Sequence, residues 1–160
     1  LAKWGGMWID STALCTDEYF FRHASKQRLF VFKQLNLGNQ EEAPIIASNW
    51  FISSEIENPI VILTRDLLYA YWKDYDYAIN YFIFHLFFAM ACRRYENEWE
   101  SIPAFNNSSP HMLMFELKRD YSSERWEQLM KMSGIHKLQR YDDYSDLKKS
   151  NYCKILDTYL

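Results

Sequence analysis

The sequence predicts an α/β fold in which strands come early and helices come late. Short runs rich in β-branched and aromatic residues occupy the first third of the 160 residues. From Asn58 onward, apolar residues recur with helical spacing. The length and a 49% hydrophobic content are enough for one domain, residues 1–160, with a buried core. Two or three strands are few for a complete sheet, so the pattern fits the back half of a larger α/β domain.

The expected elements before residue 54 are mainly strands. Gly5 is a usual residue at a helix end, so a helix tail is predicted just before it. Runs of Val, Ile, Phe and Trp predict the strands, and a polar stretch between them predicts a link. In order, we expect a helix tail over Leu1–Trp4, a strand over Met7–Asp10, a helical turn over Asp17–Arg22, a strand over Arg28–Lys33, a link over Leu35–Glu42 and a strand over Ile45–Ser53.

The second part of the chain carries repeated signals for helix starts. Asn58-Pro59 is an N-cap followed by proline, and Ser109-Pro110 repeats that signal. Further caps are expected at Asp76 and at Ser122 or Ser123, and Gly134 is expected to end the last of these helices. The predicted elements are helices from Pro59, over Tyr81 to about Arg94, over His111–Lys118 and up to Gly134, a strand over His136–Arg140 and a helix over Asp146–Tyr159.

Composition excludes several classes of protein. A net charge of −3, with basic residues scattered among acids, argues against a nucleic acid partner. The apolar run from Tyr81 to Cys92 is too short to span a membrane, and no signal peptide is recognisable. Three cysteines without a CxxC pair favour reduced thiols in a cytoplasmic protein. Serine hydrolases, zinc proteases and P-loop NTPases lack their motifs here.

The tract GGMWIDST near the start of the chain is the first candidate for a binding site. In open α/β sheets, ligands bind beyond the carboxyl ends of strands, where Asp10 is expected. Gly5 and Gly6 allow positive φ and a close backbone approach to a ligand. The alternatives are a strand-end aspartate that caps a turn and a simple helix-to-strand turn.

Other polar residues on predicted elements are weaker candidates. Ser48 and Asn49 lie where a strand is expected to end near the same edge, although they could equally satisfy loop backbone. Asn80 and His85 lie on the apolar second helix. Because they are five positions apart, their side chains are not expected on the same face of that helix. His85 could also be a core histidine. His111 falls in the first turn of a predicted helix, where the helix dipole favours a neutral imidazole that can donate a hydrogen bond to phosphate or sugar. The alternative is that His111 has no function.

Six fragments in this order resemble the capsular polysaccharide synthesis glycosyltransferases. These fragments are GGMWIDST, SNWFISSEIENP, LLYAYW, NYFIFH, SSPHML and IHKL. They extend from Gly5 to about Tyr141, and the family is related to initiating outer-chain mannosyltransferases with the GT-A nucleotide-diphospho-sugar fold. The resemblance implies a partial GT-A-like fold with a mostly helical C-terminal half. It also implies that the chain is a C-terminal portion of the enzyme.

The resemblance also implies a function, which is hexose transfer from a nucleotide diphosphate sugar to a glycan or lipid-linked acceptor. Relatives bind Mn²⁺ or Mg²⁺ through an Asp-x-Asp triplet, in which Asp10 matches the first acid and Thr12 replaces the second. The implied metal ligands are Asp10, Thr12 and His136. The implied nucleotide-sugar contacts are Gly5, Gly6, Asp10, His111 and Lys137. The implied donor or acceptor contacts are Ser48, Asn49, Asn80 and His85.

The resemblance leaves part of the chemistry open. It implies retention of anomeric configuration, but no residue is marked as a nucleophile. A cytoplasmic location is expected, with peripheral association at the inner face of the membrane as an option. The rival interpretation is a non-catalytic glycan-binding or scaffolding domain that keeps the fold after losing the second acid.

Overall fold

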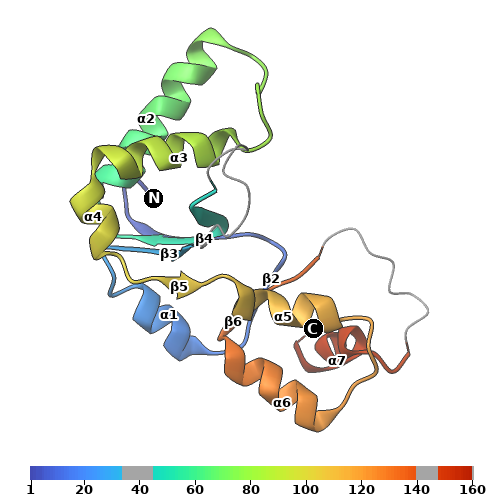
Figure 1. Cartoon of the computed structure of the whole chain (residues 1–160). Coiled ribbons are helices and arrows are strands. Elements are labelled where there is room, and N and C mark those ends of the chain that lie inside the picture. Colours follow the sequence, from blue (N-terminus) through green and yellow to red (C-terminus); the bar gives the residue numbers. More distant parts are fainter. Residues whose placement is uncertain (34–44, 140–147, 160) are drawn as a thin grey trace. The chain divides into compact units, whose positions relative to one another are not determined.

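The computed structural model describes residues 1–33, 45–139 and 148–159 (Figure 1). It contains two compact units, which are treated separately. Unit 1 consists of Leu1–Ile9 and His23–Asn107, and unit 2 consists of Asp10–Arg22 and Ser108–Leu160. The prediction of a single domain stays a prediction. Helix α1, Glu18–Ala24, confirms the predicted helical turn. Its residues up to Arg22 belong to unit 2, and its last two residues belong to unit 1.

Unit 1 is built on a mixed four-stranded sheet, which confirms the predicted α/β class. The strands, in the spatial order β1-β4-β3-β5, are Gly6–Ile9, Ala47–Ser54, Leu29–Lys33 and Phe105–Asn106. Strand β4 pairs antiparallel with both neighbours, and β5 runs parallel to β3. The three predicted strands are therefore confirmed, whereas the two-residue β5 was not predicted. The predicted link over Leu35–Glu42 lies outside the described residues.

Two helices cover one face of this sheet (Figure 1). They are α2, Pro59–Asp74, and α3, Ile83–Arg94. Leu29 and Val31 of β3 alternate toward these helices and pack with Ile60 and Phe88. Burying each such large side chain contributes about 1.5–3 kcal/mol. A third helix in unit 1, α4 over Glu96–Ser101, follows α3 and was not predicted.

The opposite face of the sheet is aromatic. Phe30 and Phe32 alternate with the two residues that face the helices, and their rings meet at 5.4 Å edge to face. Phe32 stacks on Trp50 at 5.0 Å, and Phe30 lies 4.6 Å from Phe105. Much of the high aromatic content of the chain is thus core packing.

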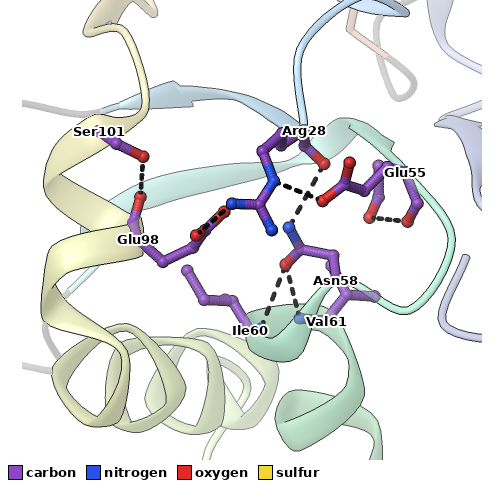
Figure 2. Close-up of polar contacts among 8 residues, drawn as sticks. Arg28, Glu55, Asn58, Ile60, Val61, Glu98 and Ser101 are labelled. Atoms are coloured by element: carbon purple, nitrogen blue, oxygen red, sulfur yellow. Dashed lines mark hydrogen bonds and ion pairs between the residues drawn. The ribbon is translucent and has the colours of Figure 1, made fainter.

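Helix α2 begins where the sequence predicts, because the Asn58 side chain caps its first turn. Its side-chain oxygen accepts hydrogen bonds from the Ile60 and Val61 amides at 3.1 and 3.4 Å. Its amide nitrogen donates to the Arg28 carbonyl at 3.3 Å (Figure 2). The Arg28 guanidinium in turn donates to Glu55 at 2.6 Å and to Glu98 at 2.8 Å. This network joins β3, the end of β4, α2 and α4.

We expect the change Asn58→Ala to lower the free energy of unfolding by about 2 kcal/mol. Asn58 is fully buried, so the loss removes two capping acceptor contacts and leaves helix amides without a partner. Ser122→Ala is the matched control, since Ser122 occupies the cap position of another helix without a side-chain hydrogen bond. Urea unfolding of both variants should show a change below about 0.5 kcal/mol for Ser122→Ala. Equal losses would contradict the role given to Asn58.

The predicted cap at Asp76 is wrong. Helix α3 begins at Ile83, and residues 75–82 form a turn-rich connection instead. The Tyr71 hydroxyl donates to the Tyr77 carbonyl at 2.6 Å and accepts from the Ile79 amide at 3.1 Å. These bonds satisfy backbone groups that a helix would otherwise have used.

In the part of the chain that the structure describes, unit 2 combines most of α1 and three further helices with a two-stranded antiparallel pair. The helices are α5, α6 and α7, and the strands are β2 and β6. Their bounds are Ser108–Glu116, Ser123–Met132, Asn151–Tyr159, Ala13–Cys15 and Ile135–Lys137. The predicted helix at Ser109-Pro110 and the helix that ends before Gly134 are confirmed. Strand β6 is shorter than predicted, β2 was not predicted, and Asp146 lies outside the described residues.

A buried carboxylate joins two helices of unit 2. Glu116, whose side chain is 7% exposed, accepts from the Arg125 Nε and Nη2 atoms at 3.0 and 2.5 Å. The hydrogen bond from Arg125 holds the pKa of Glu116 below its usual range. The Glu116 carbonyl also accepts from the Asn151 amide at 2.8 Å, which attaches α7. Within residues 1–33, 45–139 and 148–159, no helix has the length and apolar character needed to cross a membrane.

Candidate functional site

A pair of short strands in unit 2 brings together two segments that the family resemblance implies for binding, one near Thr12 and one at Lys137. Ala13 of β2 lies opposite Lys137 of β6 in the antiparallel register. Next to this pair, the Leu138 amide donates to the Thr12 carbonyl at 2.8 Å. Thr12 and Lys137, which are distant in the sequence, are therefore neighbours in the structure.

Lys137 is the centre of a polar cluster that we call the Asp10 corner, made of Asp10, Thr12 and Lys137. The ammonium donates to the Asp10 carboxylate at 3.1 Å and to the Thr12 hydroxyl. The side chains of Lys137 and Asp10 are 20% and 37% exposed, so a ligand can reach them. An ammonium carries three N–H donors, and two are used within the corner. Among the described residues, one donor therefore remains to meet an anion, while Asp10 balances the ammonium charge.

His136 is placed apart from this corner. Successive residues of a strand point to opposite faces, so its ring lies on the other side of β6 from the Lys137 side chain. The ring is fully buried, and its Nε2 lies 3.2 Å from the Thr16 hydroxyl. Burial lowers the pKa of His136 to about 4. Among the described residues, its Nδ1 atom has no hydrogen-bond partner.

His111 lies in the first turn of α5, as expected from Ser109-Pro110. Helix α5 packs against β6, so His111 belongs to an element beside the strand that carries Lys137. The imidazole is half-buried. A contact between His111 and phosphate stays a prediction.

The two glycines are placed in unit 1, at the entry to β1. Gly5 and Gly6 have φ of +64° and +96°, as the turn reading requires. A Cβ on Gly5 would lie 2.9 Å from both the Ile56 nitrogen and the Ser54 oxygen, so the close approach there is to the protein's own backbone. A Cβ on Gly6 would meet nothing within 4 Å. Contact of either glycine with a nucleotide sugar stays a prediction.

Ser48 and Asn49 are found near the beginning of β4 rather than at its end. Because β1 and β4 are antiparallel, Ile9 at the end of β1 pairs with Phe51. Both candidates therefore lie toward the carboxyl end of β1. They do so because β4 begins there, whereas the sequence analysis expected a strand to end there. Ser48 is buried and donates to the Asn107 side chain at 2.7 Å, which is a structural contact. Asn49 is exposed and lines a pocket.

Asn80 and His85 do not converge. Asn80 lies before α3, and its side chain accepts a hydrogen bond from the Phe82 amide at 2.7 Å. His85 is inside α3 and buried, and desolvation lowers its pKa while a hydrogen bond with the Ala47 backbone opposes that shift. The core interpretation of His85 thus has direct support. Binding roles for both residues stay predictions.

The pocket beside Asn49 was missed by the sequence analysis. It has a volume of about 630 Å³ and includes Trp8, Arg65 and Tyr69. Val61 and Leu68 lie seven residues apart on one side of α2, and this helical spacing is a signal that the sequence analysis did not use. The contribution of Trp8 has no local signal, because it depends on the pairing of β1 with β4.

Comparison of the chain with known proteins identifies its family. No curated protein matches the chain. No solved structure matches it either. A family model described as capsular polysaccharide synthesis protein matches residues 1–156, nearly the whole chain. The chain therefore belongs to the capsular polysaccharide synthesis protein family.

Proposed function

We propose that this protein transfers a hexose from a nucleotide diphosphate sugar to a hydroxyl group during capsular polysaccharide synthesis. The family implies a role in that synthesis. The observation that supports the finer proposal is the position of the Lys137 ammonium, held between Asp10 and Thr12 and partly open to solvent.

The proposed reaction breaks the bond between the anomeric carbon and the diphosphate oxygen. A new bond forms between that carbon and the acceptor oxygen, and the acceptor proton is released to water. Negative charge then develops on the departing diphosphate, and Lys137 is placed to stabilise it. Asp10 orients the ammonium through their 3.1 Å contact. A positioned cation of this kind accelerates the reaction most when it stabilises charge that develops in the transition state.

The implied Mn²⁺ or Mg²⁺ fits these side chains poorly. A divalent ion prefers carboxylate oxygens, but the Asp10 corner supplies one carboxylate, one neutral hydroxyl and an ammonium that contacts both. His136 faces the other side of β6. Across the part of the chain that the structure describes, no three His, Cys, Asp or Glu residues gather in a way that could hold a metal. The proposal therefore includes no step through a metal ion.

The test is a screen of nucleotide diphosphate sugars for product formation, with a mixture of glycan and lipid-linked acceptors and the full chain. We expect release of a nucleoside diphosphate together with a glycosylated acceptor for one donor. Binding of glycans without any turnover would favour the rival, non-catalytic interpretation and would overturn the proposal.

Lys137→Met is expected to weaken binding of a nucleoside diphosphate by about 10- to 100-fold. The change removes a charge-assisted hydrogen bond worth about 1.5–3 kcal/mol. Isothermal titration calorimetry measures the effect directly. Lys131→Met is the matched control, because Lys131 lies in unit 2, is 80% exposed and is 3.9 Å from Glu127. Unchanged affinity in Lys137→Met would remove Lys137 from the phosphate site.

A further inference from the structure

Unit 1 contains a pocket of about 630 Å³ that the proposed chemistry does not use. It lies on the face of the sheet that α2 and α3 cover, because Ile52, Val61 and Phe88 line the pocket and also belong to the core between sheet and helices. Trp8 of β1 pairs directly with Ile52 of β4, and both line the pocket. Its volume is in the range of small-molecule sites in proteins. The remaining lining residues are Leu1, Ala2, Lys3, Asn49, Val61, Thr64, Arg65, Leu68, Tyr69, Phe84 and Phe88.

The floor of the pocket is hydrocarbon. Ile52 and Phe88 are buried at 6% and 3% exposure, and Val61, Leu68 and Phe84 are partly buried. Among the described residues that line the pocket, the buried hydroxyl is that of Thr64, and it donates to the Ile60 carbonyl of its own helix at 2.8 Å. A sugar ring placed here would lose hydrogen bonds to water without replacement, at a cost of about 1–3 kcal/mol for each hydroxyl. The floor therefore suits an apolar chain.

The mouth of the pocket has a different character. Trp8 and Tyr69 are 54% and 70% exposed, and such rings are common where an apolar group meets water. Lys3 and Arg65 also line the pocket. Arg65 is paired with Asp66, its neighbour in sequence, at 2.7 Å. Among the described residues that line the pocket there is no acid, so its side chains contribute only positive charge.

We propose that this pocket binds the hydrocarbon chain of a lipid phosphate, with the phosphate at Lys3 and Arg65. Lys3 and Arg65 both bring N–H donors to the pocket, and a phosphate offers them more acceptor oxygens than a carboxylate does. The apolar floor takes the chain, and Trp8 and Tyr69 enclose it where it leaves the protein. A role as carrier of the acceptor rests on the proposed function, whereas the binding itself does not.

The experiment titrates the full chain with farnesyl phosphate below its micelle concentration and follows binding by calorimetry. We expect saturable binding in the absence of any nucleotide sugar. Farnesol should bind at least 5-fold more weakly, and inorganic phosphate should neither bind nor compete. Laurate, with a single negative charge, should also bind more weakly than farnesyl phosphate.

Matched pairs of variants assign the binding to this pocket. Trp8→Ala and Tyr69→Ala should weaken farnesyl phosphate binding by at least 5-fold. Trp72→Ala and Tyr81→Ala, at residues that are 45% and 92% exposed and outside the pocket, should leave it unchanged. Arg65→Gln should weaken binding of farnesyl phosphate but not of farnesol, because it removes charge and leaves the floor intact.

Two further results separate this inference from the proposed function. Leu68→Trp, which fills the pocket, should abolish lipid binding while thermal unfolding shows that the variant is folded. Asp10→Asn should bind farnesyl phosphate like the unmodified protein even if it transfers no sugar. Absent binding, binding that the pocket variants do not change, or equal affinity for farnesol and farnesyl phosphate would each overturn the inference. Lipid binding without any sugar transfer would overturn only the proposed function.

Discussion

Asp10→Asn is expected to lower kcat/KM for sugar transfer by about 100-fold or more. The substitution keeps the size of the side chain but removes the charge that holds the Lys137 ammonium at 3.1 Å. Losing one preorganised group that stabilises developing charge typically costs 10²–10³ in rate. Initial rates with the donor found in the screen measure this effect. Asp157→Asn, an exposed acid of the same unit, is the matched control and should keep full activity.

The loss should come from chemistry and not from unfolding. The Asp10–Lys137 pair is partly exposed, and pairs of this kind contribute at most about 1 kcal/mol to stability. Combining Asp10→Asn with Lys137→Met should cost much less than the sum of the two separate effects, because both remove the same arrangement. Additive losses, or an Asp10→Asn rate within 2-fold of the original, would show that the corner does not act as a unit.

Local signals predicted the helices of this protein better than its sheet contacts. Asn58-Pro59 marks the start of α2 because a cap and a proline act through neighbouring backbone groups. The start of α3 was misplaced because the competing contact, made by Tyr71, comes from the preceding helix. Strand β2 was missed because it has three residues and a partner far along the chain. Such pairing leaves no periodicity to detect.

The same distinction applies to the candidate site. Asp10 and Lys137 were placed near the diphosphate by resemblance, and their direct contact became visible only through the β2–β6 pairing. His136 is adjacent to Lys137 in sequence, yet the alternation of a strand turns it away from Asp10. The pocket needed both the register of β1 with β4 and one face of α2, and neither alone indicates a cavity.

Burial of His136 should make the protein sensitive to mild acid. The folded protein keeps this ring neutral down to a pKa of about 4, whereas an unfolded chain binds a proton near pH 6.5. Between these values the unfolded state holds more protons, so the free energy of unfolding falls as the pH falls. The stabilising effect is complete above pH 6.5 and is lost progressively toward pH 4. From pH 7.5 to 5, this single group should cost about 2 kcal/mol.

His136→Gln should remove most of that pH dependence, because glutamine offers polar atoms to Thr16 without titrating. Urea unfolding at pH 7.5 and 5 measures it, with His23→Gln as the control at an exposed histidine. His85 is also buried with a lowered pKa, so a smaller slope of the same sign should persist. Added Mn²⁺ should not change the difference, since the ring is fully buried and away from Asp10. An undiminished acid sensitivity in His136→Gln would show that another group causes it. A Mn²⁺ effect that needs His136 would return this residue to the metal-ligand role that the family resemblance implied.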